Sequence, residues 1–155
     1  MEKPPRLGRV QLRIMQVLWS RRVATAREIT DELNRRTHSE AKSKGRATRD
    51  AHREVAHREV APREVAPREI AHSTVQTLLR KLEEKGAVTH EVEGRTFRFR
   101  AVHGESEVAK SATRDLLSRV FHSSVPGLVA HLLKHEKISG DEMARLRQII
   151  EEADQ

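Results

Sequence analysis

The chain of 155 residues has no cysteine and no long apolar run. Without cysteine, neither a disulfide framework nor a thiolate metal site is possible. No apolar stretch approaches the ~20 residues of a membrane-spanning helix, and the N-terminus lacks the apolar core of a signal peptide. We therefore expect a cytoplasmic protein that does not insert into membranes.

Sequence signatures of catalysis are also missing. The chain has no glycine-rich phosphate loop, no nucleophile–base signature and no His-Glu-x-x-His motif. Its nine histidines include His131 and His135, which have the i, i+4 spacing of one helix face, but two histidines make an incomplete metal site. The sequence therefore predicts no enzyme activity, no cofactor and no metal.

Charge and hydrophobic content give the first positive indications. Lys and Arg number 30 against 23 Asp and Glu, which gives a formal net charge of +7, and hydrophobic residues make up only 36% of the chain. An excess of cations favours a polyanionic partner. The low hydrophobic share predicts that part of the chain lies outside any core.

Residues 71–86 form the best-defined element of the sequence. Ser73 and Gln76 have the spacing of a capping box, and Gly86 is the residue type expected just past a helix end. Apolar residues recur at helical spacing and predict one buried stripe. This stripe consists of Val75, Leu78, Leu79 and Leu82.

The opposite face of this helix carries short hydroxyls, an amide and cations, which are the groups that contact base edges and phosphates. Residues 87–100 then alternate as two strands around a Glu93-Gly94 turn. A helix followed by a basic hairpin is the outline of a winged helix-turn-helix, although an ordinary amphipathic helix and hairpin is the alternative. We predict base reading by Ser73, Thr74, Gln76, Thr77 and Arg80, and contacts to the DNA backbone by Lys81, Arg95 and Arg98.

Two amphipathic helices precede this unit. The first spans roughly residues 9–21 and carries Trp19, which we expect to pack in the core rather than stack on bases. The second begins at Thr25, with Glu28 at the capping-box spacing, and is expected to fade near residues 34–36. Two helices followed by the recognition helix is the order of a helix-turn-helix.

Residues 37–69 separate the second helix from the recognition helix. They include most of a five-residue repeat whose copies are residues 52–56, 57–61, 62–66 and 67–71. A period of five fits neither a helix nor a strand, and prolines at the start of two copies interrupt any helix. We expect a mostly disordered insertion, with a frayed helical piece near residues 48–61; partner binding by the repeats is an alternative.

The C-terminal part contains three further helices, expected at residues 105–121, at residues 125–135, and from a Ser139–Glu142 capping box to about Ala153. Three short apolar helices are too small to bury themselves well, so a second copy of the chain is the expected cover. The predicted dimerisation residues are Leu116, Val120, Leu128, Leu132, Leu133, Leu146, Ile149 and Ile150.

The predicted fold is therefore mainly α with a small β-hairpin wing. An N-terminal winged helix-turn-helix DNA-binding domain is expected at residues 1–102, interrupted by the polar insertion at about residues 37–69. A C-terminal helical dimerisation domain is expected at residues 103–155.

Several segments form an ordered set: residues 12–19 (LRIMQVLW), 24–29 (ATAREI), 73–86, 93–99 (EGRTFRF), 128–133 (LVAHLL) and 142–146 (EMARL). Together they resemble the penicillinase repressor family of dimeric winged-helix transcriptional repressors. The resemblance implies a repressor that binds a two-fold-symmetric, double-stranded DNA operator as a homodimer. The rival interpretation is a protein-interaction scaffold that uses the C-terminal helices and the repeat loop.

The chain departs from this family in three ways. Family members that are regulated by a membrane metalloprotease sensor are cut at an Asn-Phe bond in the C-terminal module. The equivalent positions here are His131-Leu132. An upstream protease sensor is therefore a possible partner that the resemblance does not establish. The cysteine cluster of copper-responsive relatives is absent, which excludes that mode. Finally, the insertion splits the helix-turn-helix at its turn, where family members have only a few residues.

Overall fold

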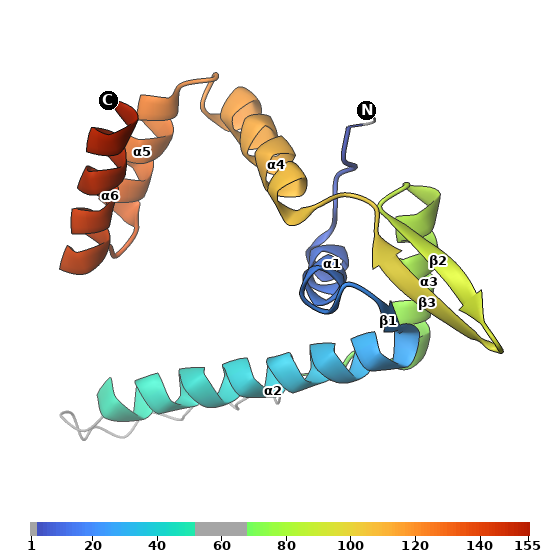
Figure 1. Ribbon diagram of the computed structural model, residues 1–155. Coiled ribbons are helices and arrows are strands. Elements are labelled where there is room, and N and C mark those ends of the chain that lie inside the picture. The colour runs from blue at the N-terminus through green and yellow to red at the C-terminus, as the bar shows by residue number, and fades with distance from the viewer. Residues whose placement is uncertain (1–2, 52–67) are drawn as a thin grey trace. The chain divides into compact units, whose positions relative to one another are not determined.

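The computed structural model describes residues 3–51 and 68–155, and the side chains of residues 43–51 are not considered (Figure 1). The chain forms two compact units, Met1–Ala109 and Lys110–Gln155. Within the described residues, none of the helices is long and apolar enough to cross a membrane.

The first unit combines three helices with one small sheet, which confirms the predicted fold class of this part. The sheet is antiparallel with strand order β1–β3–β2, and Ala24 of β1 pairs with Phe99 of β3. Sequence periodicity did not predict β1, because two residues are too short to show alternation. The elements are α1 (Arg9–Arg21), β1 (Ala24–Thr25), α2 (Ala26–Ala51), α3 (His72–Glu84), β2 (Val88–Glu93) and β3 (Thr96–Ala101).

The core of the first unit lies where α1, α2, α3 and the base of the hairpin meet. Full burial of one such aliphatic side chain stabilises a fold by roughly 1.5–3 kcal/mol, so this cluster holds the three helices together. Trp19 packs against the cluster, and its Nε1–H donates to the His103 carbonyl at 2.9 Å, as expected of a packing residue. The buried residues are Ile14, Met15, Val17, Leu18, Ala24, Ile29, Leu33, Val75, Leu79, Leu82, Ala87, Val88 and Phe99.

The predicted start of α2 is confirmed, but that of α3 is wrong. The Glu28 amide donates to Thr25 Oγ1 at 3.2 Å, and the Thr25 amide donates to Glu28 Oε2 at 2.8 Å. The helix α3 begins at His72 with Ala71 as its N-cap, which places Ser73 inside the first turn. A tertiary contact fixes the chain just before this start, because the Ile70 amide donates to Asn34 Oδ1 at 2.8 Å.

Two glycines with positive φ connect α3 to the hairpin and form its turn. Gly86 has φ +75°, and the Gly86 and Ala87 amides donate to the carbonyls of Glu83 and Leu82, which is the hydrogen-bond pattern of a Schellman motif. This confirms the predicted helix end. Gly94 has φ +63° at the first position of the two-residue loop between β2 and β3, where a type II′ turn requires it.

The predicted extent of α2 is wrong. We expected a helix that fades near residues 34–36 and a mostly disordered segment from residue 37, but α2 continues to Ala51. Arg13 of α1 supports the extension, because its Nη2 donates to Thr37 Oγ1 at 2.7 Å. No proline follows until residue 62, and each added residue contributes one helical hydrogen bond. The remainder of the predicted disordered and frayed segment, up to residue 67, lies outside the described residues.

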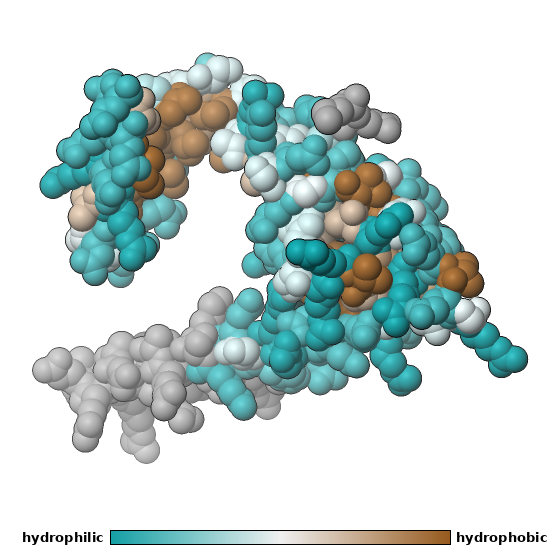
Figure 2. Space-filling view, in the orientation of Figure 1, coloured by the Kyte–Doolittle hydropathy of each residue, from teal (hydrophilic) through white to brown (hydrophobic). Residues whose placement is uncertain are grey.

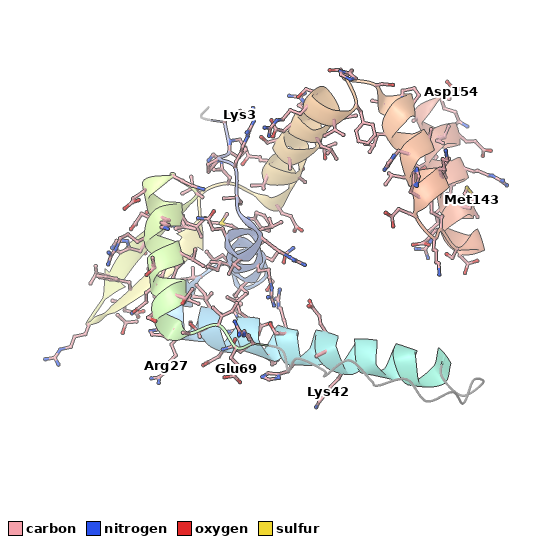
Figure 3. The ribbon with its side chains drawn as sticks, turned by 180° about the vertical axis from the view of Figure 1, so that it is seen from behind. Lys3, Arg27, Lys42, Glu69, Met143 and Asp154 are labelled. Carbon is pink, nitrogen blue, oxygen red and sulfur yellow. The ribbon has the colours of Figure 1, made fainter. Side chains whose placement is uncertain are left out.

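The insertion is closed at its base by contacts between α2 and the residues that precede α3. Asn34 Nδ2 donates to the Ile70 carbonyl at 3.1 Å, and His38 Nε2 lies 3.0 Å from Glu69 Oε1. Figure 3 shows Glu69 beside α2, where the chain returns towards α3. The helix-turn-helix is therefore interrupted at a point where its two ends are already fixed together.

The C-terminal helices lie at the predicted positions: α4 (Glu105–Val120), α5 (Val125–His135) and α6 (Gly140–Ala153). The Ser139–Glu142 capping box is confirmed, with the Glu142 amide donating to Ser139 Oγ at 3.2 Å. No residue of the second unit is buried, and Figure 2 shows hydrophobic residues gathered over α5. The helices α5 and α6 therefore present apolar side chains on the surface of the second unit.

Candidate nucleic-acid interface

The helix α3 has one buried face and one exposed face. The five predicted base-reading residues and Lys81 are all exposed. At about 100° per residue, Ser73, Thr77 and Arg80 lie along the line opposite the buried stripe. Gln76 lies on the hairpin side of that line, while Thr74 and Lys81 lie on the other side. Thr77 Oγ1 donates to the Ser73 carbonyl at 3.0 Å, so its oxygen can still accept a hydrogen bond from another group.

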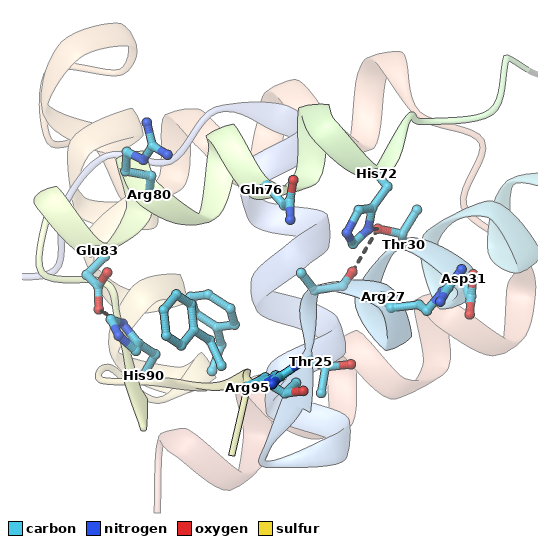
Figure 4. Close-up of a pocket in the computed structure, with 14 residues that line it drawn as sticks. Thr25, Arg27, Thr30, Asp31, His72, Gln76, Arg80, Glu83, His90 and Arg95 are labelled. Carbon is cyan, nitrogen blue, oxygen red and sulfur yellow. Dashed lines mark hydrogen bonds and ion pairs between the residues drawn. The ribbon is translucent and has the colours of Figure 1, made fainter. Parts of the chain in front are cut away.

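A groove of about 1000 Å³ runs between α3, the start of α2 and the hairpin (Figure 4). Three cations line it, namely Arg27 of α2, Arg80 of α3 and Arg95 of the hairpin turn. Figure 4 shows Gln76 and His72 pointing from α3 towards the groove, whereas Arg80 extends away from it. The structure therefore brings Gln76, Arg80 and Arg95 together around one concave surface.

His72 connects the first turn of α3 to α2. Thr30 Oγ1 donates to the Ala26 carbonyl at 2.7 Å and lies 3.2 Å from His72 Nδ1. Because a hydroxyl has only one hydrogen, His72 Nδ1 must be the donor in the second contact. This bond fixes the orientation of the imidazole at the N-terminal end of the groove.

His90 connects the hairpin to the last turn of α3. Its Nδ1 lies 2.5 Å from Glu83 Oε1, and its ring centroid lies 4.5 Å from that of Phe97 and 5.7 Å from that of Phe99. The hairpin is therefore attached to α3 by a polar contact as well as by its buried base. These contacts fix the width of the groove beside the last turn of α3.

The predicted backbone contacts Arg95 and Arg98 differ in their surroundings. Arg98 forms an ion pair with Glu93 across the hairpin, and Arg100 pairs with Glu91 at 3.1 Å. In the part of the chain that the structure describes, Arg95 forms no ion pair. Exposed pairs contribute only about 0–1 kcal/mol, so Arg98 could exchange Glu93 for a phosphate at little cost. Arg95 is available without such an exchange.

Sequence reasoning missed the groove itself and the residues that complete it. Arg27 and His72 occupy the first turns of α2 and α3, which the contact between Thr30 and His72 joins beside the groove. Phe97 lies in a strand that the sequence predicts, but the sequence predicts no DNA contact for it. Its alternation with Phe99 was the available signal, because it places both rings on the same side of the hairpin.

The histidine pair of α5 gains no third ligand in the structure. The rings of His131 and His135 lie with their centroids 4.5 Å apart. Among residues 3–42 and 68–155, no group of three or more potential metal ligands is present. This part of the chain therefore offers no metal centre to describe.

Comparison with known proteins identifies the family. The sequence model described as "Penicillinase repressor" matches residues 50–152, about two thirds of the chain. The chain belongs to the penicillinase repressor family. The prediction made from the ordered segments is therefore confirmed.

Individual relatives agree with this family. The penicillinase repressor of Bacillus licheniformis is 25% identical over 152 residues, which cover 98% of this chain and 94% of that protein. The methicillin resistance regulatory protein MecI of Staphylococcus aureus (strain N315) is 25% identical over 77 residues, which cover 50% of this chain and 63% of that protein. These similarities support a transcriptional repressor.

Two solved structures are also similar. The DNA-binding domain of the repressor BlaI, a solution structure, matches with a TM-score of 0.41 and 24% identity over 69% of this chain and 93% of that one. The complex structure of hsRosR-SG matches with a TM-score of 0.45 and 16% identity over 99% of this chain and 96% of that one.

Proposed function

We propose that this protein is a sequence-specific transcriptional repressor that binds a two-fold-symmetric duplex DNA operator as a homodimer. The supporting observation is the exposed polar face of α3 beside a groove lined by Arg27, Arg80 and Arg95. Membership of the penicillinase repressor family adds to this support. The domain at residues 1–102 would bind DNA, and the one at residues 103–155 would dimerise.

The proposed complex places α3 in the major groove, with its N-terminal half at the base edges. Gln76 can form paired hydrogen bonds with adenine, and Arg80 can do so with guanine. Ser73, Thr74 and Thr77 offer hydroxyls to neighbouring positions. Cations at the edge of the helix and on the hairpin would hold the phosphates, and these are Lys81, Arg95 and Arg98.

Dimerisation is proposed from the exposed apolar side chains of the C-terminal helices. Leu132 is 42% exposed and Ile150 is 62% exposed in the single chain. The other predicted interface residues are Leu116, Val120, Leu128, Leu133, Leu146 and Ile149. A symmetric pair of chains would cover these groups and would bring two copies of α3 to two half-sites.

The function can be tested by selecting bound sequences from random duplexes with the full-length protein. The expected result is a palindromic site whose affinity falls steeply as salt concentration rises, because phosphate contacts release counterions. A protein-interaction scaffold would select no sequence, and its duplex affinity would stay negligible at low salt. That second outcome would refute the repressor proposal.

A further inference from the structure

The two faces of the β2–β3 hairpin differ in chemistry. The strand register places Val92 opposite Phe97 and His90 opposite Phe99, so these side chains share the inner face. The outer face carries the charged residues, which pair with one another as Arg98–Glu93 and Arg100–Glu91. The hairpin is therefore nearly neutral outside and apolar inside.

Only half of this inner face belongs to the core. Near the base of the hairpin, Val88 is 2% exposed and Phe99 is 8% exposed. Nearer the turn, Phe97 is 51% exposed and Val92 is 65% exposed. The apolar inner face therefore extends past the part of the first unit that covers it.

Phe97 differs from Val92 because it lines the groove and is held in place. Its ring packs against His90, which is in turn bonded to Glu83 of α3. Arg80 and Arg95 line the same groove. The structure thus holds an exposed aromatic ring in the same groove as Arg95, a cation that suits a phosphate.

We infer that Phe97 packs against a deoxyribose of the DNA strand that passes between α3 and the hairpin. The inference rests on the proposed function. Successive phosphates of a strand are separated by a sugar, so a ring that lines the same groove as the phosphate-binding cation Arg95 meets sugar carbons. Arg27, Arg80 and Arg95 outnumber the acidic lining residues Asp31 and Glu83, and Glu83 is already paired with His90.

An apolar contact of this kind has a distinct dependence on salt. Each phosphate contact contributes to the slope of log K against log salt, whereas burial of an apolar ring releases no counterions. Phe97 should therefore supply affinity that is the same at every salt concentration. Arg95 should supply affinity that disappears as salt rises.

The test measures binding of the full-length protein to its selected operator across a salt series, by fluorescence anisotropy. Phe97→Thr should weaken binding about tenfold at every salt concentration and leave the slope unchanged. Val92→Thr is the matched control, because it makes the same kind of change at the facing position outside the groove, and it should bind as the wild type does. Arg95→Ala should flatten the slope by about one unit.

A second variant separates the apolar contact from a folding defect. Phe97→Leu keeps an apolar side chain in the same strand and should bind within about threefold of the wild type. The inference is overturned if Phe97→Thr binds normally, if Val92→Thr weakens binding equally, if Phe97→Leu is as weak as Phe97→Thr, or if the slope changes with Phe97. Failure of the wild type to bind any duplex would instead refute the proposed function, and the inference with it.

Discussion

Arg80 is the residue whose substitution best separates base reading from backbone contact. It lies on the exposed line of α3 and extends away from the groove. Arg80→Ala should cost about 1–3 kcal/mol of operator binding and relax the preference at one base of each half-site. Repeating the duplex selection with the variant measures this preference.

Lys81→Ala is the matched comparison on the neighbouring position of the same helix. As a proposed phosphate contact, it should weaken binding to all sequences alike and reduce the salt slope by about one unit. An Arg80 variant with this same behaviour would show that Arg80 contacts the backbone, and the base-reading assignment would be wrong.

The side chain of Glu32 is buried between α1 and α2. It pairs with Arg36 at 2.7 Å, with Arg21 at 3.7 Å and with Arg35. The hydrogen bond from Arg36 is the largest cause that lowers the pKa of Glu32 below 4.5, and burial opposes it. A lowered pKa in the folded state means that this stabilisation is present above the unfolded pKa and is lost as pH falls through the folded pKa.

Glu32→Gln should therefore reduce the free energy of unfolding by about 1–2 kcal/mol at neutral pH, because the arginines that it leaves are partly exposed. Urea denaturation at pH 7 and at steps below pH 4.5 measures the difference, which should shrink towards acid pH. Glu84→Gln on the exposed face of α3 is the control and should change stability little at either pH. A deficit that is independent of pH would show that the ion pairs contribute nothing.

At the scale of elements, patterns of neighbouring residues predicted the helices well. They did not predict the helix boundaries that depend on tertiary contacts. The caps at Thr25 and Ser139 and the end at Gly86 depend on a few neighbouring residues, so they are visible in the sequence. The start of α3 depends on Asn34, which is 36 residues from Ile70. The length of α2 depends partly on Arg13 of α1. The groove needs three elements together, so no single pattern could indicate it.

The insertion between α2 and α3 can be removed to test whether the DNA-reading surface needs it. A variant that joins His38 directly to Ile70 keeps both Asn34 and Ile70, and it removes the exposed His38–Glu69 pair, which contributes about 0–1 kcal/mol. It should fold and keep its operator preference, because Leu33 is the last core residue of α2 among those whose side chains the structure describes. It should lose some salt-dependent affinity for random duplexes, since Lys42, Lys44, Arg46 and Arg49 are removed together.

Substituting these four cations by glutamine in the full-length chain is the matched control. Both variants should lose salt-dependent affinity for random duplexes, because both remove these four cations; the deletion also removes four arginines and six acidic residues of the insertion. Competition with random DNA at several salt concentrations measures this loss. If the deletion also abolished base preference, the insertion would be a part of the DNA-reading surface.

At the scale of the whole molecule, the proposed operator symmetry depends on the C-terminal helices. Leu132 of α5 is 42% exposed in the single chain, so an aspartate at this position can stay in water while the chain is monomeric. In the proposed dimer, the same charge would be buried without a partner, which is strongly unfavourable. Leu132→Asp should therefore sediment as a folded monomer.

The loss of the dimer should in turn lower operator affinity by far more than any single contact does. Two linked recognition helices bind two half-sites with an effective concentration that a monomer lacks, so affinity should fall by at least about 100-fold. Affinity for one isolated half-site should stay within a few-fold of the wild type, because α3 and the hairpin are unchanged. Lys134→Asp, on the polar side of the same helix, should remain dimeric; a Leu132→Asp variant that also remains dimeric would place the interface elsewhere.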